Sequence, residues 1–403
     1  MRISTALMYQ TGSTAISRQQ SELSRTQQQI STGRRMLAPS DDPVAASEAL
    51  RVEQGRALTS QYLSAQGAAR DRLSILEVRL GDAGDMYQSL RQLTVQAGNA
   101  ALSNADRASL AREVRGLQNQ LLAIANSSDG QGGYLFSGFN VDTQPFDRTP
   151  AGITYNGDQG QRLLEVAAGR QIAVTANGAQ VFDRVRDGNG VFATRAGAVN
   201  TGTAVVSAGS VTDASLITRH DYQINFSVVA GVTTYDVLDL TAGTTLSTGN
   251  AYAAGDAIAF DGLSFKVDGA PANGDSLSVR PSQNSSVFDM VDALARALET
   301  PVITSADKAE LQNSLGQAMT HLDRAIDTAL DVRTGVGAAL RELDGLGDMA
   351  SADALQADAR LGELRDLDLA EAISRLSLQS TALEAAQQAY LRTTGLTLFN
   401  FLN

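Results

Sequence analysis

The chain has 403 residues, of which 43% are hydrophobic and 5% aromatic, and it contains neither cysteine nor tryptophan. Its net charge of −12 argues against a nucleic-acid or anionic-membrane partner, since binding phosphate groups needs clustered positive charge. The lack of cysteine excludes disulfides, thiolate metal sites and thiol nucleophiles. The length allows two or three domains, and the few aromatic residues favour cores of Ala, Leu, Val and Ile.

A first helix is expected from about Ser4 to Thr32, with Gly33 just beyond its end, where a left-handed residue is favoured. It carries one apolar residue every seven positions, the narrow stripe with which a helix packs against a partner helix. The companion positions, such as Ser13 and Gln20, are polar, so the helix should not be stable alone. The stripe consists of Tyr9, Ile16, Leu23, Ile30 and Leu37, the last of which falls in the following loop.

Further amphipathic helices are expected on both sides of the middle of the chain. Asp42 is a suitable N-cap with Pro43 at the first helical position, Ser103 or Asn104 can cap a second helix, and Ser305 a third. Apolar residues three and four apart form their core-facing stripes. These are Leu73, Leu76, Leu80, Ala83, Tyr87 and Leu90, then Leu110, Val114, Leu117, Leu121 and Ile124, and finally Leu311, Leu315, Met319, Leu322 and Ile326.

The middle of the chain holds most of the 36 glycines, a composition that favours β-structure there. Six dipeptides in this part are typical of hairpin turns, in which two consecutive residues need positive φ. Residues 130–185 are interpreted as hairpins attached to the helical domain, and 191–280 as a β-rich insert. The dipeptides are Asn156-Gly157, Asn177-Gly178, Asn189-Gly190, Asp261-Gly262, Asp268-Gly269 and Asn273-Gly274.

A last helix is expected to run to about Thr394, with Gly395 as its stop. It repeats the seven-residue stripe with Leu369, Leu376, Leu383 and Tyr390, and an apolar tail follows. Residues 1–44 carry more basic than acidic side chains, whereas 366–403 carry more acidic ones, which favours pairing of the two ends. The fold class predicted is therefore mainly α, a helical coiled-coil bundle drawn from both termini, with β-hairpins and an inserted β domain.

The sequence contains no constellation typical of catalysis. His220 and His321 are far apart, and neither a His-Glu-x-x-His zinc motif nor a P-loop occurs. Gly188–Ala193 resembles half of a dinucleotide fingerprint but lacks the flanking strand and helix, so a hairpin turn is the better interpretation. The carboxylates of Asp366, Asp368 and Glu371 fit a solvated first helical turn. We predict no enzyme, no cofactor, no metal site and no catalytic residue.

Four segments resemble parts of a known family. Ile30-Ser-Thr-Gly-Arg-Arg-Met-Leu-Ala-Pro-Ser-Asp-Asp-Pro43 is similar to the N-terminal signature of bacterial flagellins and their relatives, and Asp368 to Tyr390 to the C-terminal signature. Gly133-Tyr-Leu-Phe-Ser-Gly138 and the ending Leu398-Phe-Asn-Phe-Leu402 are similar to members at the hook–filament junction.

The resemblance implies a layered subunit of the flagellar axis. Residues 1–44 and 366–403 would form a terminal coiled coil that is disordered in the monomer and builds an inner tube. Residues 45–190 and 281–365 would form a helical bundle with β-hairpins, and 191–280 an outward domain. The resemblance assigns inner-tube packing to Ile16, Leu23, Ile30, Leu37, Leu369, Ile373, Leu376, Leu383 and Tyr390. It assigns chaperone binding to Leu398, Phe399 and Phe401.

The resemblance also implies partners and a location. The subunit would be exported unfolded by the flagellar type III export apparatus after release from a cytoplasmic export chaperone. It would assemble as a homo-oligomer between a preceding hook-associated protein and flagellin, outside the cell. Met1 to Leu7 lack the pattern of a secretory signal, so we expect export without a cleaved leader, and no membrane insertion.

Two alternatives remain open from the sequence. The chain could be a filament flagellin, which should form long filaments from purified monomer. It could instead be a secreted surface-binding protein that acts through residues 191–280, since sugar sites often consist of a few Asn, Asp and Tyr side chains on loops. A glycan or surface panel tested with the insert would distinguish this function.

Overall fold

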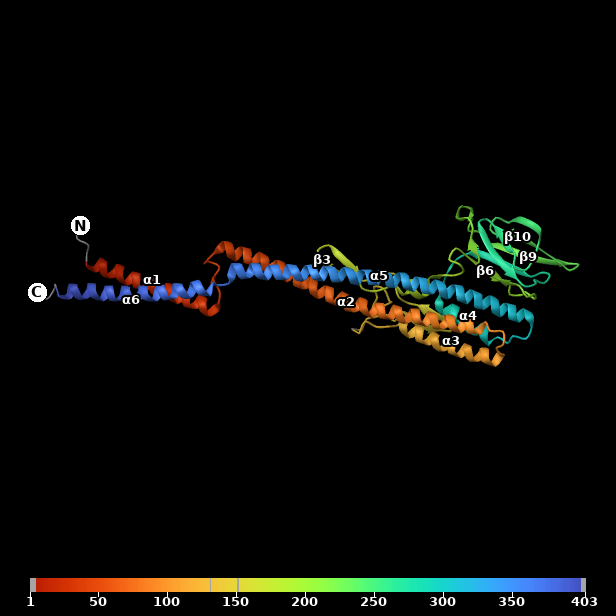
Figure 1. Cartoon of the computed structure of the whole chain (residues 1–403), viewed down its shortest axis with the longest axis horizontal. Coiled ribbons are helices and arrows are strands. Elements are labelled where there is room, and N and C mark those ends of the chain that lie inside the picture. Colours follow the sequence, from red (N-terminus) through yellow and green to blue (C-terminus); the bar gives the residue numbers. More distant parts are fainter. Residues whose placement is uncertain (1–4, 131, 151, 400–403) are drawn as a thin grey trace. The chain divides into compact units, whose positions relative to one another are not determined.

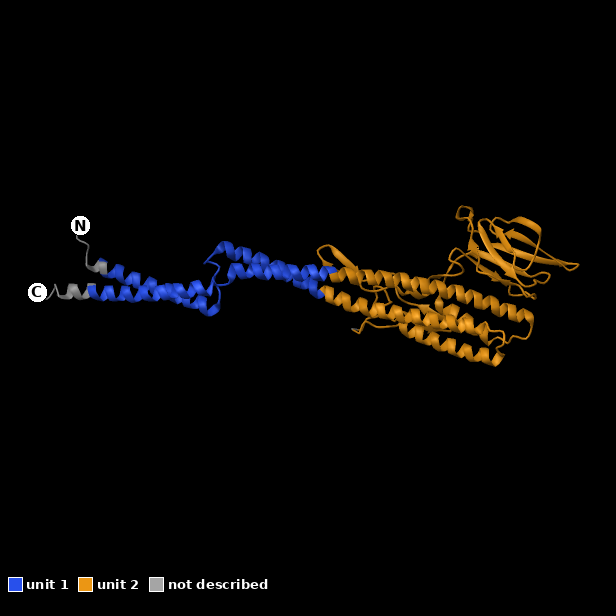
Figure 2. Ribbon diagram, viewed as in Figure 1, with its two compact units in different colours: residues 1–64, 345–403 blue, residues 65–344 orange. Residues whose placement is uncertain are grey.

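The computed structural model describes residues 5–130, 132–150 and 152–399, with the side chains of residues 7, 9–130, 132–150 and 152–392. The chain forms two compact units, residues 1–64 with 345–403 and residues 65–344 (Figure 2). The three layers that the family resemblance implies are a different division and stay a prediction. Six α-helices are present in the described residues: α1 Thr5–Thr32, α2 Pro43–Ala97, α3 Asn104–Ala125, α4 Val287–Glu299, α5 Ser305–Arg365 and α6 Leu369–Phe399 (Figure 1).

All fifteen strands of the described residues lie between α3 and α4. They are β1 Phe146–Thr149, β2 Gly152–Tyr155, β3 Leu163–Ala167, β4 Arg170–Ala173, β5 Val185–Arg186, β6 Phe192–Ala196, β7 Val205–Val206, β8 Ser210–Val211, β9 Tyr222–Val229, β10 Val232–Asp239, β11 Thr244–Ala251, β12 Ala257–Phe260, β13 Leu263–Asp268, β14 Ser276–Pro281 and β15 Asn284–Ser285. This arrangement confirms the predicted fold class, a mainly α chain with a β-rich insert.

The helix starts follow from local capping. The Asp42 carboxylate accepts a bond from the Ala45 N–H at 3.0 Å, which caps α2 one residue before Pro43. Ser103 and Asp106 form a reciprocal capping box on α3. Helix α5 begins at Ser305, but the prediction that Ser305 is its cap was wrong. The hydroxyl of the preceding Thr304 accepts the Asp307 N–H, because the cap must stand outside the first helical turn.

The stop predicted at Gly395 is also wrong, because α6 continues to Phe399. Glycine in a helix costs only about 1 kcal/mol relative to alanine, and it ends a helix only when its backbone turns left-handed. Gly33 does so after α1, with φ of 66°, as expected.

Of the six dipeptides, only Asp261-Gly262 forms a two-residue hairpin turn, with φ of 45° and 73° between β12 and β13. The tight turn between β9 and β10 is made by Ala230 and Gly231, with φ of 51° and 80°. Asn177-Gly178 instead precedes a short π-helix at Ala179–Asp183. The other dipeptides lie in loops or at strand ends, so the turn signal identified a hairpin at one position only.

The insert is a β-sandwich with its own core. One sheet has the order β11-β10-β9-β14-β6, and the other has β12-β13-β7 with β8 added to β13. Buried residues alternate along β9, where Tyr222, Ile224 and Phe226 point into the sandwich. Phe192 and Phe265 add two further aromatic rings to this core, and its remaining members are the Ala, Val, Ile and Leu side chains expected from the composition.

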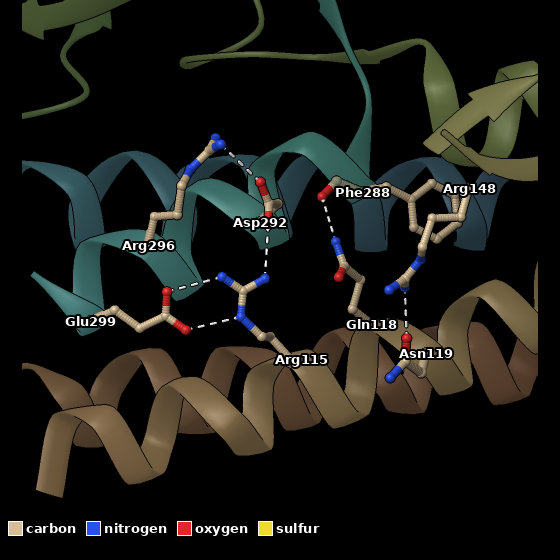
Figure 3. A network of polar contacts seen from close by, with 8 residues as sticks. All are labelled: Arg115, Gln118, Asn119, Arg148, Phe288, Asp292, Arg296 and Glu299. Carbon is tan, nitrogen blue, oxygen red and sulfur yellow. Dashed lines mark hydrogen bonds and ion pairs between the residues drawn. The ribbon is translucent and has the colours of Figure 1, made fainter. Parts of the chain in front are cut away.

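In the bundle of residues 65–344, the predicted stripe from Leu73 to Leu90 is at most 1% exposed. A polar clamp fixes α4 against α3 (Figure 3). The Arg115 guanidinium donates two hydrogen bonds of 2.9 Å to Glu299 and one of 3.0 Å to Asp292. Gln118 adds a buried bond of 3.0 Å to the Phe288 carbonyl, so both ends of α4 are held.

Candidate assembly surface on the terminal helices

Helices α1 and α6 lie side by side and antiparallel in the first compact unit (Figures 1 and 2). Backbone bonds join them at one end. The Arg35 N–H donates to the Arg365 carbonyl at 2.7 Å, and the Leu367 N–H donates to the Gly33 carbonyl at 2.9 Å. These bonds align the seven-residue stripes of two segments more than three hundred residues apart in the sequence.

The other end of the pair is closed by two tyrosines. The rings of Tyr9 and Tyr390 meet edge to face, with centroids 6.3 Å apart. Gly12 lies one turn along α1, and a Cβ atom there would stand 2.8 Å from the Tyr390 ring. The close approach of the two helices at this end therefore depends on a residue without a side chain.

The loop between α1 and α2 is organised by Asp41. Its carboxylate accepts the N–H groups of Leu37 and Ala38 at 2.9 and 3.1 Å, and pairs with Arg25 at 2.6 Å. These backbone bonds, to Ala38 first, lower the pKa of Asp41 below its ordinary value. Leu37 therefore belongs to this loop and is 37% exposed, outside the face that α1 and α6 share.

The apolar stripe between α1 and α6 is only half covered. Six of the residues predicted for inner-tube packing are half-buried there, and Ala372 is the single apolar residue of the pair's described side chains that is fully buried, at 1% exposure. Thr26 and Gln29 are the buried polar members of α1. The six are Ile16, Leu23, Ile30, Leu376, Leu383 and Tyr390.

Other apolar side chains of α6 are more exposed than those of the half-buried stripe. Leu369 and Ile373, which sequence reasoning placed in the packing stripe, are 52% and 57% exposed. Leu378 and Leu391, which it missed, are 70% and 68% exposed. Leu378, Ala382 and Ala385 follow one another at four and three residues and are all exposed, so a helical-wheel count could have found this row.

The C-terminal tail predicted to bind a chaperone falls largely outside the described residues. Leu398 and Phe399 belong to the last turn of α6, but their side chains are not among those described, and neither is any part of Phe401. Their assignment to chaperone binding stays a prediction.

The described residues contain no group of three His, Asp or Glu side chains placed to hold a metal ion. In that same part of the chain, no helix combines the length and apolar character that crossing a membrane requires. The His220–Asp239 contact of 2.7 Å is a single pair on the insert, so the geometry that stands out is the exposed apolar surface of α6.

Models of known families match two parts of the chain. Residues 3–141 match the bacterial flagellin N-terminal helical region. Residues 196–281 match the D2-like domain of flagellar hook-associated protein 1, which corresponds to the β-sandwich insert.

Individual relatives extend the similarity over the whole chain. Flagellar hook-associated protein 3 of Escherichia coli strain K12 is 29% identical over 400 residues, 99% of each chain. The crystal structure of flagellar hook-associated protein 3 from Legionella pneumophila is 33% identical with a TM-score of 0.74, covering 78% of this chain and 98% of that one. The flagellar junction protein FlgL from the same species is 34% identical with a TM-score of 0.71, covering 79% and 100%. This chain therefore belongs to the family of flagellar hook-associated protein 3.

Proposed function

We propose that this chain is a structural subunit of the bacterial flagellum that joins the hook to the filament. It acts by packing its terminal helices against those of neighbouring subunits rather than by catalysis. The family membership supports the flagellar role, and one of its solved members is described as a junction protein.

The observation that carries this proposal is the incomplete burial of the terminal pair. A helix in a stable bundle buries an apolar face about 100° wide, but α1 and α6 cover only part of theirs. Exposed Leu369, Ile373 and Leu378 add apolar area on α6 that one partner helix leaves open. Helices of neighbouring copies supply the missing burial, so assembly and ordering of the ends are coupled.

The partners follow from this position in the axis. The homo-oligomer stands on the preceding hook-associated protein and carries the first flagellin subunits. Before assembly, the C-terminal region with Leu398, Phe399 and Phe401 is covered by a cytoplasmic export chaperone, and the chain then leaves through the flagellar type III apparatus without a cleaved leader. The final location is extracellular, at the hook–filament junction.

The deciding experiment is deletion of the gene in the source bacterium, with complementation. We expect hooks without filaments, loss of motility, and unpolymerised flagellin in the medium. Attached filaments of normal length in the deletion strain would contradict the junction role and favour a redundant flagellin or an accessory surface protein.

Point variants test the packing surface within the same strain. Leu23→Asp or Leu376→Asp places a charge in the half-buried face between α1 and α6, and should abolish filament attachment while the bundle remains folded. The matched control is Leu330→Asp, because Leu330 is 51% exposed on α5 in the other compact unit. Normal filaments with Leu23→Asp and Leu376→Asp would refute the assignment of these residues.

A further inference from the structure

The insert meets the bundle at a small junction lined by both polar and apolar side chains. Its core cluster consists only of residues between Phe192 and Val279, so it does not share a core with the helices. A groove of about 290 Å³ separates strands β6 and β7 of the insert from α4 and α5. The insert's position on the bundle therefore depends on the few groups that line or bridge this groove.

One bridge is the side chain of Asn313 on α5, which is 6% exposed. Its Oδ1 accepts the Val206 N–H at 2.9 Å, and its Nδ2 donates to the Ala204 carbonyl at 2.9 Å. The amide thus pairs with β7 as the backbone of a neighbouring strand would. Both backbone groups are buried, so removing the amide would leave them unsatisfied.

The second feature is His321, two turns further along α5 and on the same groove. It is 5% exposed, and its Nε2 has no hydrogen-bond partner among the described residues. Burial is the largest influence on this imidazole and lowers its pKa below the ordinary value of 6.5. The closed junction therefore contains a neutral histidine.

Charged groups lie around His321 on several elements of the junction. Asp187, in the loop after β5, pairs with Arg280 of β14 at 2.6 Å and with Arg195 of β6 at 3.6 Å. Asp187 favours a charged imidazole and Arg195 opposes it. Asp289 of α4 lines the same groove.

Arg324 lies one turn after His321 on α5, and its guanidinium pairs with Asp327 of the same helix at 3.2 Å. The carboxylate that favours a charged His321, that of Asp187, is already shared between two arginines, Arg195 and Arg280. Asp187 is the largest influence that favours a charged His321, and burial of the ring outweighs it, so the pKa of His321 is lowered in the closed junction.

We propose that the junction between the insert and α5 is an acid-sensitive latch, in which Asn313 holds β7 against the helix and protonation of His321 releases the insert. The direction of the pH effect on closure follows from the neutral state of His321 in the closed form. Its contribution to closure is complete above pH 6.5, the ordinary pKa, and is lost as the pH falls through the lowered pKa. Burial and neighbouring carboxylates raise the pKa of Asp289, so its protonation would strengthen closure on acidification and cannot cause release.

The absence of cysteine from the chain permits a direct distance measurement. Spin labels on Val199→Cys in the insert and Leu330→Cys on α5 occupy positions that are 83% and 51% exposed. We expect one narrow distance distribution at about pH 7.5 that broadens as the full-length chain is brought to about pH 5. In the labelled chain with His321→Gln, the distance distribution should stay narrow at every pH. In the labelled chain with His220→Gln, which changes the more exposed histidine, the distribution should broaden as it does in the parent.

A second measurement does not depend on a variant at position 321. Histidine NMR of the His220→Gln chain follows the titration of His321 alone, and its midpoint should coincide with the broadening. If the distance distribution of the His321→Gln chain is broad at every pH, the agreement between the His321 titration midpoint and the broadening tests the proposal instead. The proposal would be overturned by any of three results. The distance distribution of the parent could stay narrow to about pH 5, that of the His321→Gln chain could broaden like the parent's, or His321 could titrate while the junction stays closed.

Discussion

The bundle and the terminal pair are built from the same kinds of residue but bury them to different extents. Along α2 the side chains of Leu73, Leu76 and Leu80 are each 1% exposed, because several helices of the same chain surround them. Along α1 and α6 a stripe of similar composition is half-buried, with Ala372 the only fully buried apolar residue among the described side chains. A periodic apolar stripe thus predicts the direction of packing, whereas the number of partner helices decides how much is buried.

The largest difference between the two regions should appear when one leucine of each is truncated. Leu76→Ala removes fully buried methyl groups and should lower the free energy of unfolding by about 2–5 kcal/mol. Leu383→Ala acts on a half-buried side chain and should cost about 1 kcal/mol or less in the monomer. Urea denaturation followed by circular dichroism measures both. Equal losses would mean that the terminal pair is as well packed as the bundle.

A helix cap in the bundle should have the next largest effect. Ser103→Ala removes the acceptor for the Asp106 N–H and should lower the free energy of unfolding by about 1 kcal/mol. Ser109→Ala, on the exposed face of the same helix, is the control and should change little. A loss with Ser109→Ala as large as with Ser103→Ala would contradict the specific role of the cap.

The clamp between α3 and α4 should contribute less to the free energy of unfolding, and only at pH values at which Glu299 is ionised. Hydrogen bonding to Arg115 lowers the pKa of Glu299, so its stabilisation is present above its ordinary pKa of 4.5 and is lost as the pH falls through the lowered value. Because both side chains are more than a third exposed, Glu299→Gln should cost at most about 1 kcal/mol at pH 7.

The urea midpoints of parent and Glu299→Gln should converge as the pH falls below 4.5 and through the lowered pKa, because the carboxylate then becomes protonated in the folded chain as well as in the unfolded chain. Glu310→Gln, an exposed glutamate on α5, should match the parent throughout this pH range. A difference between parent and Glu299→Gln that is unchanged at the lower pH would rule out an ionic contribution from the clamp.

The smallest effect on the monomer is expected on the outer face of α6. Leu378→Ser changes a side chain that is 70% exposed and should alter the free energy of unfolding by no more than about 0.5 kcal/mol. The same variant should nevertheless reduce filament attachment in cells, because it removes apolar area that neighbouring copies cover. Full attachment together with unchanged stability would show that this face has no partner.

Local signals in the sequence predicted the elements well where one short segment decides the outcome. The cap at Asp42 and the left-handed Gly33 were found because their chemistry involves neighbours within a few residues. Gly395 was misjudged since glycine ends a helix only in a left-handed conformation. The turn at Ala230 was missed because the pairing of β9 with β10 imposes positive φ on a residue that does not prefer it.

The candidate surface was predictable in part. The seven-residue search found Ile16, Leu23 and Leu376 but not Leu378, which lies on another face of the helix and forms its own row with alanines. The junction residues could not be predicted, because Asn313 meets Val206 across 107 positions of sequence and neither residue belongs to a motif. Only the fold brings such groups together.

Neighbouring subunits are expected to cover the exposed apolar side chains of α6, and the accessibility of a cysteine placed there measures this burial. Leu378→Cys is compared with Val199→Cys, an 83% exposed position on the insert, in purified monomer and in isolated hook–filament structures. We predict rapid maleimide labelling of both in the monomer, and protection of position 378 alone after assembly. Equal labelling of position 378 in the monomer and in the assembled flagellum would contradict this claim.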